Sequence, residues 1–560
     1  MHPLDIPEIA LQVGLYFDSS SLLPCILVSR SWYQAFLPTL WKTISLPPTG
    51  QHRRPGPNVP MPWLSVLQRH GHLIHELSTI KLFPEETIRV LQVLELPNLQ
   101  SVVLRINSQP EVGAHHQLKP FIRQHQGSLR NLTLIQDNLY GEFGHQDPRF
   151  RRVQLEPRLR TPNPEYSVWK LVWEGLGGNP SSINGEHTIQ SDERGDLSGQ
   201  RLRSLTVGGA LVYWQEEFDA CPGLWEFLKN LDSLTLWGLH LGTPDPVDEA
   251  VIPDVADTLS STEPSLTSSA SSLVSEPSLP FARMAGSRVR DLSLCEGDAG
   301  AVDIEVALIQ QCTELRSLTW CNDSGQDTFQ ESFCLLLDRL AFLNSLDLGI
   351  PGMTESDCML MLRSVRQPLR KLVLRESTRL STRATCALLE EDDERHAATL
   401  EILHLPKSNE MTGLCTQMIL SSCPKLQSFH VINGVQNRDI TMDPREWACK
   451  DLRELELHLD SKLNSLSQDI IKELYSVDDF MRSTSLTNTT SGHVTVRTRK
   501  SAEQFNLMFE RMKALDNLQS LAIHGRQCTR FKEATVVDGQ VHLQWSKWTV
   551  DLMSSDTQKW

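Results

Sequence analysis

Several features that would place this chain in a familiar class are missing from its sequence. No run of about 18 apolar residues occurs, so no membrane-spanning helix is expected. The N-terminus carries Asp5 and Glu8 and lacks a basic region followed by an apolar stretch, so no signal peptide is expected. The 12 cysteines include no Cys-x-x-Cys pair and mostly lie among apolar residues, which favours buried free thiols over disulfides or a zinc site. These absences predict a cytoplasmic or nuclear protein.

An excess of positive charge is also missing. The formal net charge is −16, whereas a nucleic-acid-binding surface needs clustered Lys and Arg to neutralise phosphates. We therefore expect neither a nucleic acid nor a membrane as a partner. The composition, 40% hydrophobic and 22% charged with 13 Trp, is that of a folded protein. At 560 residues, the chain is too long for one ordinary compact domain, which predicts several domains or a repeat array.

Catalytic motifs are absent as well. The sequence has no Gly-x-x-x-x-Gly-Lys-Ser/Thr phosphate loop, no Gly-x-Ser-x-Gly nucleophile turn and no His-Glu-x-x-His zinc helix. Glu454, Glu456 and His458 alternate along one predicted strand, which is more typical of a polar binding surface than of acid–base chemistry. We expect no catalytic residues, no cofactor and no metal, and thus a protein that is not an enzyme.

The first 46 residues carry signals for three short helices. Asp5, Pro7 and Glu8 are typical of a helix start, because an acidic side chain can accept hydrogen bonds from free backbone N–H groups and Pro needs no donor there. Apolar residues then recur at helical spacing through Phe17, and again over residues 22–28 and 32–40. Three such helices form only a marginal core. Some of their apolar residues should therefore face another element or another protein.

The order of residues in this segment resembles the F-box. The family's Leu-x-x-Pro-Glu-Ile-like opening is matched by residues 4–9, LDIPEI, and its Leu-Leu-x-Cys-x-x-Val-Ser/Cys-Arg-x-Trp centre by residues 22–32, LLPCILVSRSW. The Leu-Trp close is matched by Leu40 and Trp41. The chain departs from the pattern at Ser19–Ser21, where the family often has an acidic step. The stretch from Ser29 to Pro38 is similar to fungal members of the family.

This resemblance implies that the segment docks on the Skp-family adaptor of a cullin-RING (SCF) ubiquitin ligase and, through it, on cullin. Such an interface would be an apolar packing of helix on helix. Trp32 and Trp41 are as well suited to internal packing as to this contact. By family analogy, the candidate adaptor-binding residues are Leu4, Pro7, Ile9, Leu22, Leu23 and Val28.

After residue 70 a Leu-x-x-Leu-x-Leu pattern returns many times. Between residues 315 and 452 its copies start about 26 to 31 residues apart, which is the period of leucine-rich repeats. The last two leucines of a copy are two apart, so both point to one face of a strand and the residue between them points away. Segments between the copies have helical spacing, such as Phe329, Phe333, Leu336, Leu337 and Leu340. The pattern predicts an α/β solenoid, with parallel strands on the concave face and helices on the convex face.

The predicted domain organisation follows from these segments. We expect an F-box at 1–46, a linker at 47–70, an irregular leucine-rich-repeat solenoid at 71–545 and a C-terminal tail at 546–560. Polar stretches near 141–165, 177–200 and 243–285 are typical of disordered insertions. Cys221, Cys312 and Cys423 each precede a predicted strand, which is similar to the cysteine-containing repeats of F-box/leucine-rich-repeat proteins.

Residues beside the buried leucines should line the concave face. They are polar and carry no uniform charge, which suits a protein or a degron peptide. The candidates for substrate binding are Ser317, Thr319, Ser345, Asp347, Lys371, Ser428, His430, Glu454 and Glu456. The family resemblance implies the substrate-recognition subunit of an SCF ubiquitin ligase, while a repeat scaffold that takes no part in ubiquitination is the alternative. The identity of the substrate is not encoded in these patterns.

Overall fold

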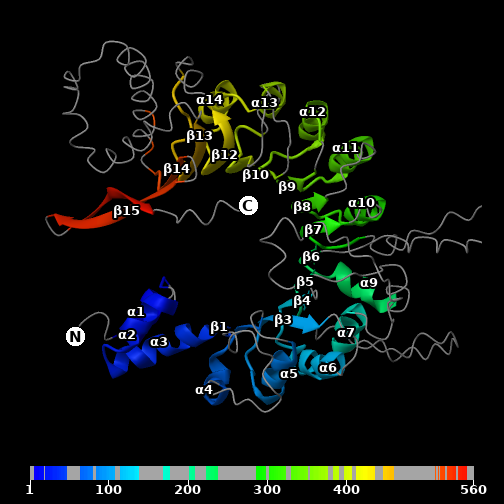
Figure 1. Ribbon diagram of the computed structural model, residues 1–560, viewed down its shortest axis with the longest axis vertical. Coiled ribbons are helices and arrows are strands. Elements are labelled where there is room, and N and C mark those ends of the chain that lie inside the picture. The colour runs from blue at the N-terminus through cyan, green and yellow to red at the C-terminus, as the bar shows by residue number, and fades with distance from the viewer. Residues whose placement is uncertain are drawn as a thin grey trace, which may run out of the picture. The chain divides into compact units, whose positions relative to one another are not determined.

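The chain divides into two compact units in a computed structural model (Figure 1). Unit 1 comprises residues 1–289 and 303–312, and unit 2 comprises residues 290–302 and 313–560. Within the described part of the chain, no helix is both long and apolar enough to cross a membrane. The described residues are 6–14, 16–17, 19–46, 64–79, 84–107, 114–137, 168–176, 201–208, 222–237, 286–297, 302–322, 330–350, 353–375, 382–389, 396–405, 411–435, 445–459, 511, 515, 517–523, 526–537 and 540–551.

Unit 1 begins with three helices. They are α1 (Pro7–Gly14), α2 (Ser19–Ile26) and α3 (Arg30–Lys42). Helix α3 begins after Ser29, whose hydroxyl accepts a hydrogen bond from the Trp32 backbone N–H at 3.1 Å and so satisfies one free donor of the first turn. The helix continues past Pro38 to Lys42, directly before the first strand.

The rest of unit 1 alternates helices with parallel strands. Strands β1 to β6 pair in chain order, each parallel to the next. Residues 64–70, assigned above to a linker, form helix α4. The elements are β1 (Thr43–Ser45), α4 (Leu64–His70), η2 (Gly71–Leu73), β2 (Glu76–Ser78), α5 (Pro84–Val93), β3 (Ser101–Asn107), α6 (Ala114–His125), β4 (Asn131–Asp137), α7 (Val168–Gly175), β5 (Ser204–Gly208), α9 (Pro222–Lys229), β6 (Ser233–Trp237) and α10 (Val302–Gln311).

Unit 2 also alternates helices with parallel strands, and its last two strands are antiparallel. Strands β7 to β14 pair in chain order and in parallel. Strands β15 and β16 continue the sheet in the antiparallel sense. The elements are β7 (Asp291–Gly297), β8 (Ser317–Asn322), α11 (Gln330–Arg339), β9 (Ser345–Gly349), α12 (Glu355–Ser364), β10 (Lys371–Leu374), α13 (Thr382–Leu389), β11 (Ile402–Leu405), α14 (Gly413–Ser422), β12 (Ser428–Val435), β13 (Glu454–Leu459), β14 (Ser520–Ile523), β15 (Arg526–Val537) and β16 (Gln540–Asp551).

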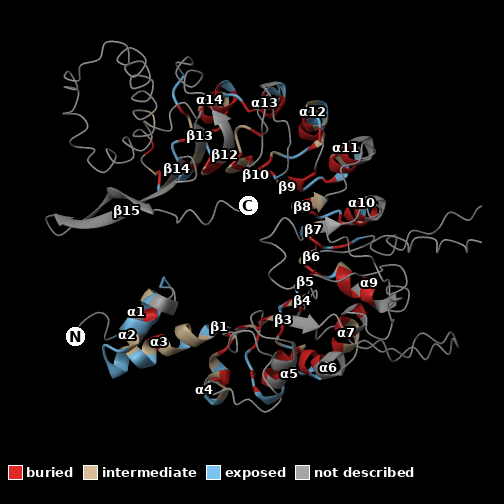
Figure 2. Cartoon of the chain, in the orientation of Figure 1, coloured by how far each residue is buried: buried red, intermediate tan, exposed pale blue. Residues whose placement is uncertain are grey.

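The repeated leucines form the core of each unit. In unit 2 the second leucine of successive copies, Leu318, Leu346, Leu372 and Leu403, has a relative exposure of 0% (Figure 2). The turn before each strand also repeats, because two consecutive N–H groups donate to one carbonyl of the preceding copy. The N–H groups of Arg316 and its successor both reach the Arg290 carbonyl, at 2.7 and 2.9 Å. Each copy is therefore held mainly by its neighbours, as expected of a repeat array.

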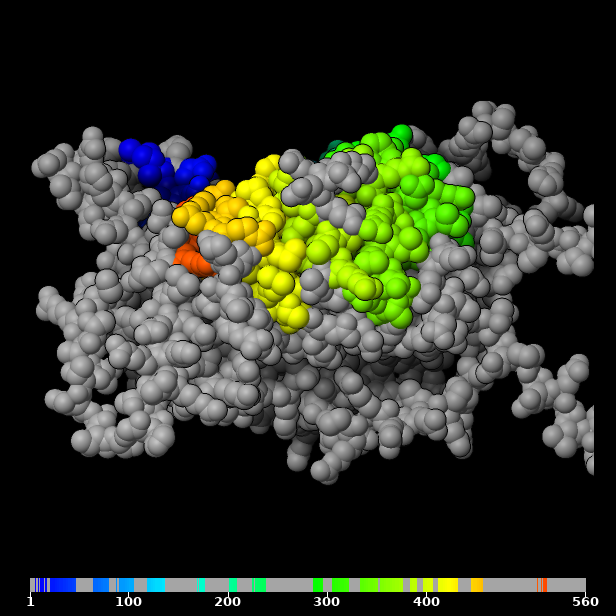
Figure 3. All heavy atoms as spheres, turned by 90° about the horizontal axis from the view of Figure 1, so that it is seen from above, coloured from blue at the N-terminus to red at the C-terminus, as the bar shows by residue number. Residues whose placement is uncertain are grey.

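The helices of unit 2 lie on one side of the strands (Figure 1). Described residues of unit 2 appear in green, yellow and orange on the face seen in the space-filling view (Figure 3). Helix α11 buries Phe333, Leu336 and Leu337, with Leu340 just beyond its end, which matches the predicted apolar stripe. Helix α12 begins with a capping box, in which Thr354 Oγ1 accepts from the Asp357 N–H at 3.3 Å and Asp357 accepts from the Thr354 N–H at 2.8 Å.

The predicted α/β class with a repeat-like parallel sheet is confirmed. The antiparallel hairpin of β15 and β16 was not predicted, and β16 crosses the boundary placed at residue 545. Its reversed direction ends the parallel repeat pattern inside the span predicted as solenoid. The three predicted insertions lie outside the described residues, as does Phe329 of the α11 stripe.

Candidate binding surfaces

The three N-terminal helices expose an unusual number of apolar side chains. The described residues include 16 exposed large hydrophobic side chains, and nine of them precede residue 34. Exposed apolar side chains gathered in one short segment make it a candidate interaction site. We define the helical patch as the exposed side chains of Ile6, Ile9, Leu11, Tyr16, Phe17, Leu23, Leu27, Val28 and Tyr33.

Three residues of this patch lie on α2 and the turn that follows it. The relative exposures of Leu23, Leu27 and Val28 are 52%, 85% and 64%. Helix α2 ends at Ile26, and the N–H groups of Leu27 and Val28 donate to carbonyls three residues earlier, at 3.2 and 3.1 Å. This tight turn fixes the backbone while both side chains remain in solvent.

The predicted adaptor-binding residues separate into different environments. Ile9, at 40% exposure, joins Leu23 and Val28 on the surface. Pro7 is the first residue of α1, and its side chain is outside the described set. Leu4 also lies outside the described residues.

Leu22 differs from Ile9, Leu23 and Val28 in being buried. Its exposure is 1%, and with Phe36, also at 1%, it forms the core between the helices. Trp32 packs edge-on against Phe36, with ring centroids 5.6 Å apart. Leu22 is therefore a core residue of the three helices in this structure, and its adaptor-binding role stays a prediction.

The second candidate surface is the side of the unit 2 sheet that bears polar side chains. Strand register aligns the residues of neighbouring copies in rows. Ser317, Ser345 and Lys371 share one row, and Thr319 and Asp347 share the next. His430 pairs with Glu456 across β12 and β13, and Ser428 with Glu454. The register thus brings the nine predicted substrate-binding residues onto one face. We define the polar face as Ser293, Cys295, Ser317, Thr319, Cys321, Ser345, Asp347, Lys371, Arg375, His404, Ser428, His430, Glu454 and Glu456.

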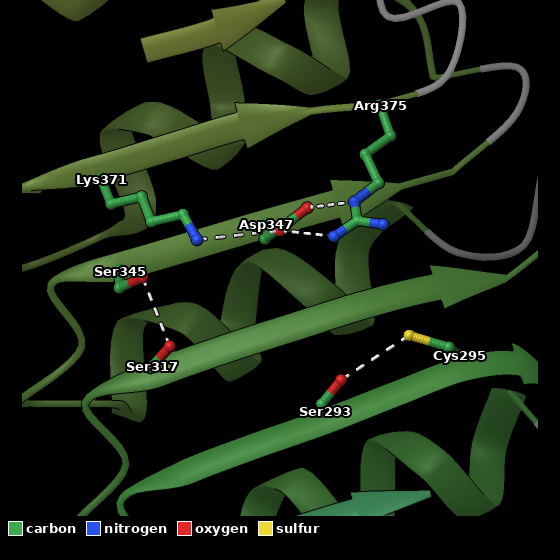
Figure 4. Close-up of polar contacts among 7 residues, drawn as sticks. All are labelled: Ser293, Cys295, Ser317, Ser345, Asp347, Lys371 and Arg375. Carbon is green, nitrogen blue, oxygen red and sulfur yellow. Dashed lines mark hydrogen bonds and ion pairs between the residues drawn. The ribbon is translucent and has the colours of Figure 1, made fainter. Parts of the chain in front are cut away.

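One group of the polar face is centred on the buried carboxylate of Asp347 (Figure 4). Arg375 donates to both of its oxygens, from Nε at 2.7 Å and from an Nη at 2.9 Å, which is the strong two-point geometry of this pair. Lys371 Nζ lies 4.0 Å from the same carboxylate. These hydrogen bonds, which Asp347 accepts, raise the pKa of Arg375. The side chains of Lys371 and Arg375 stay 38% and 51% exposed, so cationic groups remain available to a partner.

A second group surrounds the Ser428 hydroxyl. It donates to Glu454 Oε2 at 2.8 Å and lies 2.9 Å from His404 Nε2 and 3.2 Å from His430 Nε2. A hydroxyl has one proton and two lone pairs, so both imidazoles donate to it when Glu454 accepts its proton. The two rings are stacked, with centroids 4.0 Å apart and planes inclined by 13°. On the far side of His430, Nδ1 lies 3.5 Å from Glu456 Oε2.

Burial has a clear electrostatic effect on His404. Burial is the largest cause and the neighbouring His430 the next, and together they lower the pKa of this imidazole to about 4. Desolvation disfavours the charged form, and a second imidazole at stacking distance repels it. His404 is therefore neutral near pH 7 and acts in this group as a hydrogen-bond donor.

The order Ser428, His430, Glu456 has the outline of a nucleophile, base and acid. The hydrogen bonds oppose that chemistry, because the hydroxyl proton is held by Glu454 and the histidine donates to the serine oxygen. The Ser428 backbone N–H is also committed to the Glu401 carbonyl at 3.0 Å, so it cannot stabilise an oxyanion. The arrangement is a hydrogen-bonded network on the polar face. No group of three or more metal-binding side chains lies close enough to hold an ion within the described segments.

The ten cysteines whose side chains the structure describes are free. Cys312 and Cys423 are buried before β8 and β12, and burial raises the pKa of both thiols to about 12. Cys221 lies outside the described residues. Cys295 and Cys321 differ from the buried thiols, because they are partly exposed on the polar face.

Sequence reasoning missed several members of these surfaces. Leu27 occupies a variable position of the F-box-like pattern, although it is the most exposed apolar residue of α2 and its turn. His404 is the residue between two buried leucines, Leu403 and Leu405, so the repeat rule itself could have found it. Arg375 follows its copy's last leucine and therefore falls outside the repeat pattern.

The chain was compared with known proteins. No protein-family model matches it, and no curated protein sequence matches it significantly. The parallel sheet and its helices define the chain as an α/β repeat protein with a helical N-terminal segment.

Proposed function

We propose that this chain is the substrate-recognition subunit of an SCF-type ubiquitin ligase. Its N-terminal helices act as an F-box that binds a Skp-family adaptor, and its leucine-rich repeats bind a protein substrate. The subunit itself transfers no ubiquitin. It holds the substrate near the ubiquitin-loaded conjugating enzyme and so raises the effective concentration of the reacting groups.

The observation that carries this proposal is the exposure of Leu23, Leu27 and Val28 inside the F-box-like sequence LLPCILVSRSW. Complete burial of an aliphatic side chain is worth about 1.5–3 kcal/mol, so three left in solvent forgo a large stabilisation. A partner that covers them recovers it. Exposed apolar anchors beside a rigid turn are the expected form of a helical docking site.

The polar face supports the second half of the proposal. It has cationic groups at Lys371 and Arg375, and carboxylates at Glu454 and Glu456. Such alternating charge selects a protein partner by complementarity, whereas a single sign would favour a polyanion. The repeats line these groups up along successive strands, so an extended peptide could contact several of them.

The test is the affinity of the full-length chain for a purified Skp-family adaptor. Leu27→Asp and Val28→Asp place a charge in the helical patch without touching the Leu22–Phe36 core. The matched control is Leu335→Asp, since Leu335 is a 65% exposed leucine on a helix of unit 2. Loss of a central interface anchor costs about 2 kcal/mol or more, roughly a 30-fold weaker Kd. Leu22→Asp is unsuitable, because it would disrupt the helices themselves.

The proposal predicts tight binding by the natural chain and the control, and weak binding by Leu27→Asp with an unchanged circular dichroism spectrum. An adaptor complex that recruits cullin and ubiquitinates a captured partner supports the ligase assignment. Binding of the adaptor without any cullin recruitment would instead make the chain a scaffold. If the natural chain does not bind the adaptor, the proposed function is wrong.

A further inference from the structure

Two thiols meet on the polar face at the start of unit 2. Cys295 on β7 and Cys321 on β8 are register partners in a parallel pair of strands. Neighbouring strands lie about 4.8 Å apart, and disulfides span Cα separations of about 4.4–6.8 Å. The backbone spacing is therefore compatible with a covalent bond between them.

The strand pairing is irregular next to Cys295, and a glycine lies next to Cys321. The register shifts between Cys295 and Gly297, immediately after the cysteine pair, so the end of β7 is released from regular pairing. Across β8, Gly349 is the register partner of Cys321, and a Cβ added there would lie 3.0 Å from Cys321 Sγ. The absence of a side chain at Gly349 thus leaves the space that the Cys321 sulfur occupies.

The surroundings of the pair favour the thiolate of Cys295. Hydrogen bonds from Cys321 and Ser293, together with the positive charge of Arg375, lower its pKa to about 7, although burial and Asp347 act in the opposite direction. The Ser293 hydroxyl lies 3.6 Å from Cys295 Sγ, and Figure 4 shows the two side chains directed toward each other. The same contact raises the pKa of Cys321, so this thiol keeps its proton. One thiolate beside one thiol is the arrangement of a reactive and a resolving cysteine.

We propose that Cys295 and Cys321 form a dithiol modification site that a peroxide oxidises to a disulfide between β7 and β8. This inference concerns the repeats alone and does not depend on the adaptor-binding function. The other described cysteines lack such a register partner in the paired strands of the sheet, and six of them are buried.

The proposed chemistry balances with hydrogen peroxide as the oxidant. The Cys295 thiolate attacks one peroxide oxygen, the O–O bond breaks, and a sulfenic acid and hydroxide form. The Cys321 sulfur then attacks the sulfur of the sulfenic acid, the S–O bond breaks, and the oxygen leaves as water with the Cys321 proton. Two thiol sulfurs are oxidised by one electron each, and the peroxide is reduced by two. A thiol reductant reverses the product by thiol–disulfide exchange.

Oxidation would alter the surface beside it. The thiolate of Cys295 offsets part of the charge of Arg375, and a neutral disulfide removes that negative charge. The cross-link also fixes the end of β7, where pairing is irregular. The Asp347–Arg375 pair would therefore become more cationic when the dithiol is oxidised.

The test uses the full-length chain, reduced and then treated with hydrogen peroxide. Remaining thiols are blocked by alkylation, and the protein is digested and analysed by mass spectrometry without reduction. We expect one cross-linked peptide pair joining Cys295 to Cys321, which disappears after treatment with dithiothreitol. In the Cys321→Ser variant, Cys295 should instead be trapped as a sulfenic acid by dimedone, since its resolving thiol is missing.

The exposed Cys386 on α13 serves as the internal control, because its greater exposure alone would make it the preferred target. Preferential oxidation of Cys386, or an absence of the Cys295–Cys321 linked peptide, overturns the proposal. A dimedone adduct on Cys295 in Cys321→Ser, together with the linked peptide in the natural chain, supports it. Because adaptor binding is not measured, failure here leaves the proposed function unaffected.

Discussion

The helical patch and the polar face differ in how their side chains are accommodated: apolar side chains are exposed in the first, and polar side chains are buried in the second. In the helical patch, Leu27 and Val28 stand in solvent because three short helices enclose only a small core around Leu22 and Phe36. On the polar face, Asp347 and Ser428 are buried, yet hydrogen bonds within the sheet satisfy both. Under the proposed function, a partner covers the exposed apolar surface of the small segment, whereas the preformed polar network selects a partner by its fixed donors and acceptors.

This difference predicts that the two regions respond differently to substitution. The helical segment should be sensitive at its two core residues and tolerant across its surface. The polar face should be sensitive at the groups that several neighbours share.

The largest effect is expected for Phe36→Ala. Phe36 is 1% exposed, and truncating a buried Phe costs about 3–5 kcal/mol because it leaves a cavity. A core this small cannot absorb that loss, so hydrogen exchange in α1–α3 should become fast. The matched surface change, Leu27→Ala at 85% exposure, should alter stability by no more than about 0.5 kcal/mol. Equal effects of the two substitutions would show that the helices do not pack around Phe36.

A smaller effect is expected for Asp347→Asn. Removing the charge leaves Arg375 and Lys371 facing each other without their shared carboxylate. We expect a loss of about 1–2 kcal/mol in the free energy of unfolding, measured in urea, because both cations are partly exposed to water. Asp338→Asn is the control, since it removes a similar bidentate pair with Arg366 in which both side chains are exposed. Its effect should be clearly smaller, and the reverse order would contradict the assigned role of burial.

The smallest effect is a dependence of stability on pH through His404. Its folded pKa of about 4 lies below the ordinary value of 6.5, so the unfolded chain binds a proton first as the pH falls. This contribution to stability is complete above pH 6.5, decreases as the pH falls, and is lost near pH 4. The groups that face this imidazole are His430, Glu454, Lys371 and Asp347. In urea titrations between pH 7 and pH 5, His404→Gln should lose less stability than the natural chain, and an equal loss would show that another group titrates.

The repeat architecture could be predicted because its cause is local. Each copy opens with two leucines at fixed spacing, such as Leu315 and Leu318, and a strand places alternate residues on opposite faces. The candidate residues of the polar face followed from the same rule. The family analogy could not separate Leu22 from Leu23, because burial on a short helix depends on how it packs against α3. Contacts such as His404 with His430 depend on the register between two copies, which no single copy contains.

The central claim is that the helical patch, and not the polar face, binds the Skp-family adaptor. Hydrogen–deuterium exchange of the full-length chain with and without the adaptor measures this directly. The account predicts slower exchange in residues 19–46 when the adaptor is added, and no change in strands β8–β13. Protection across β8–β13, or none in residues 19–46, would contradict it.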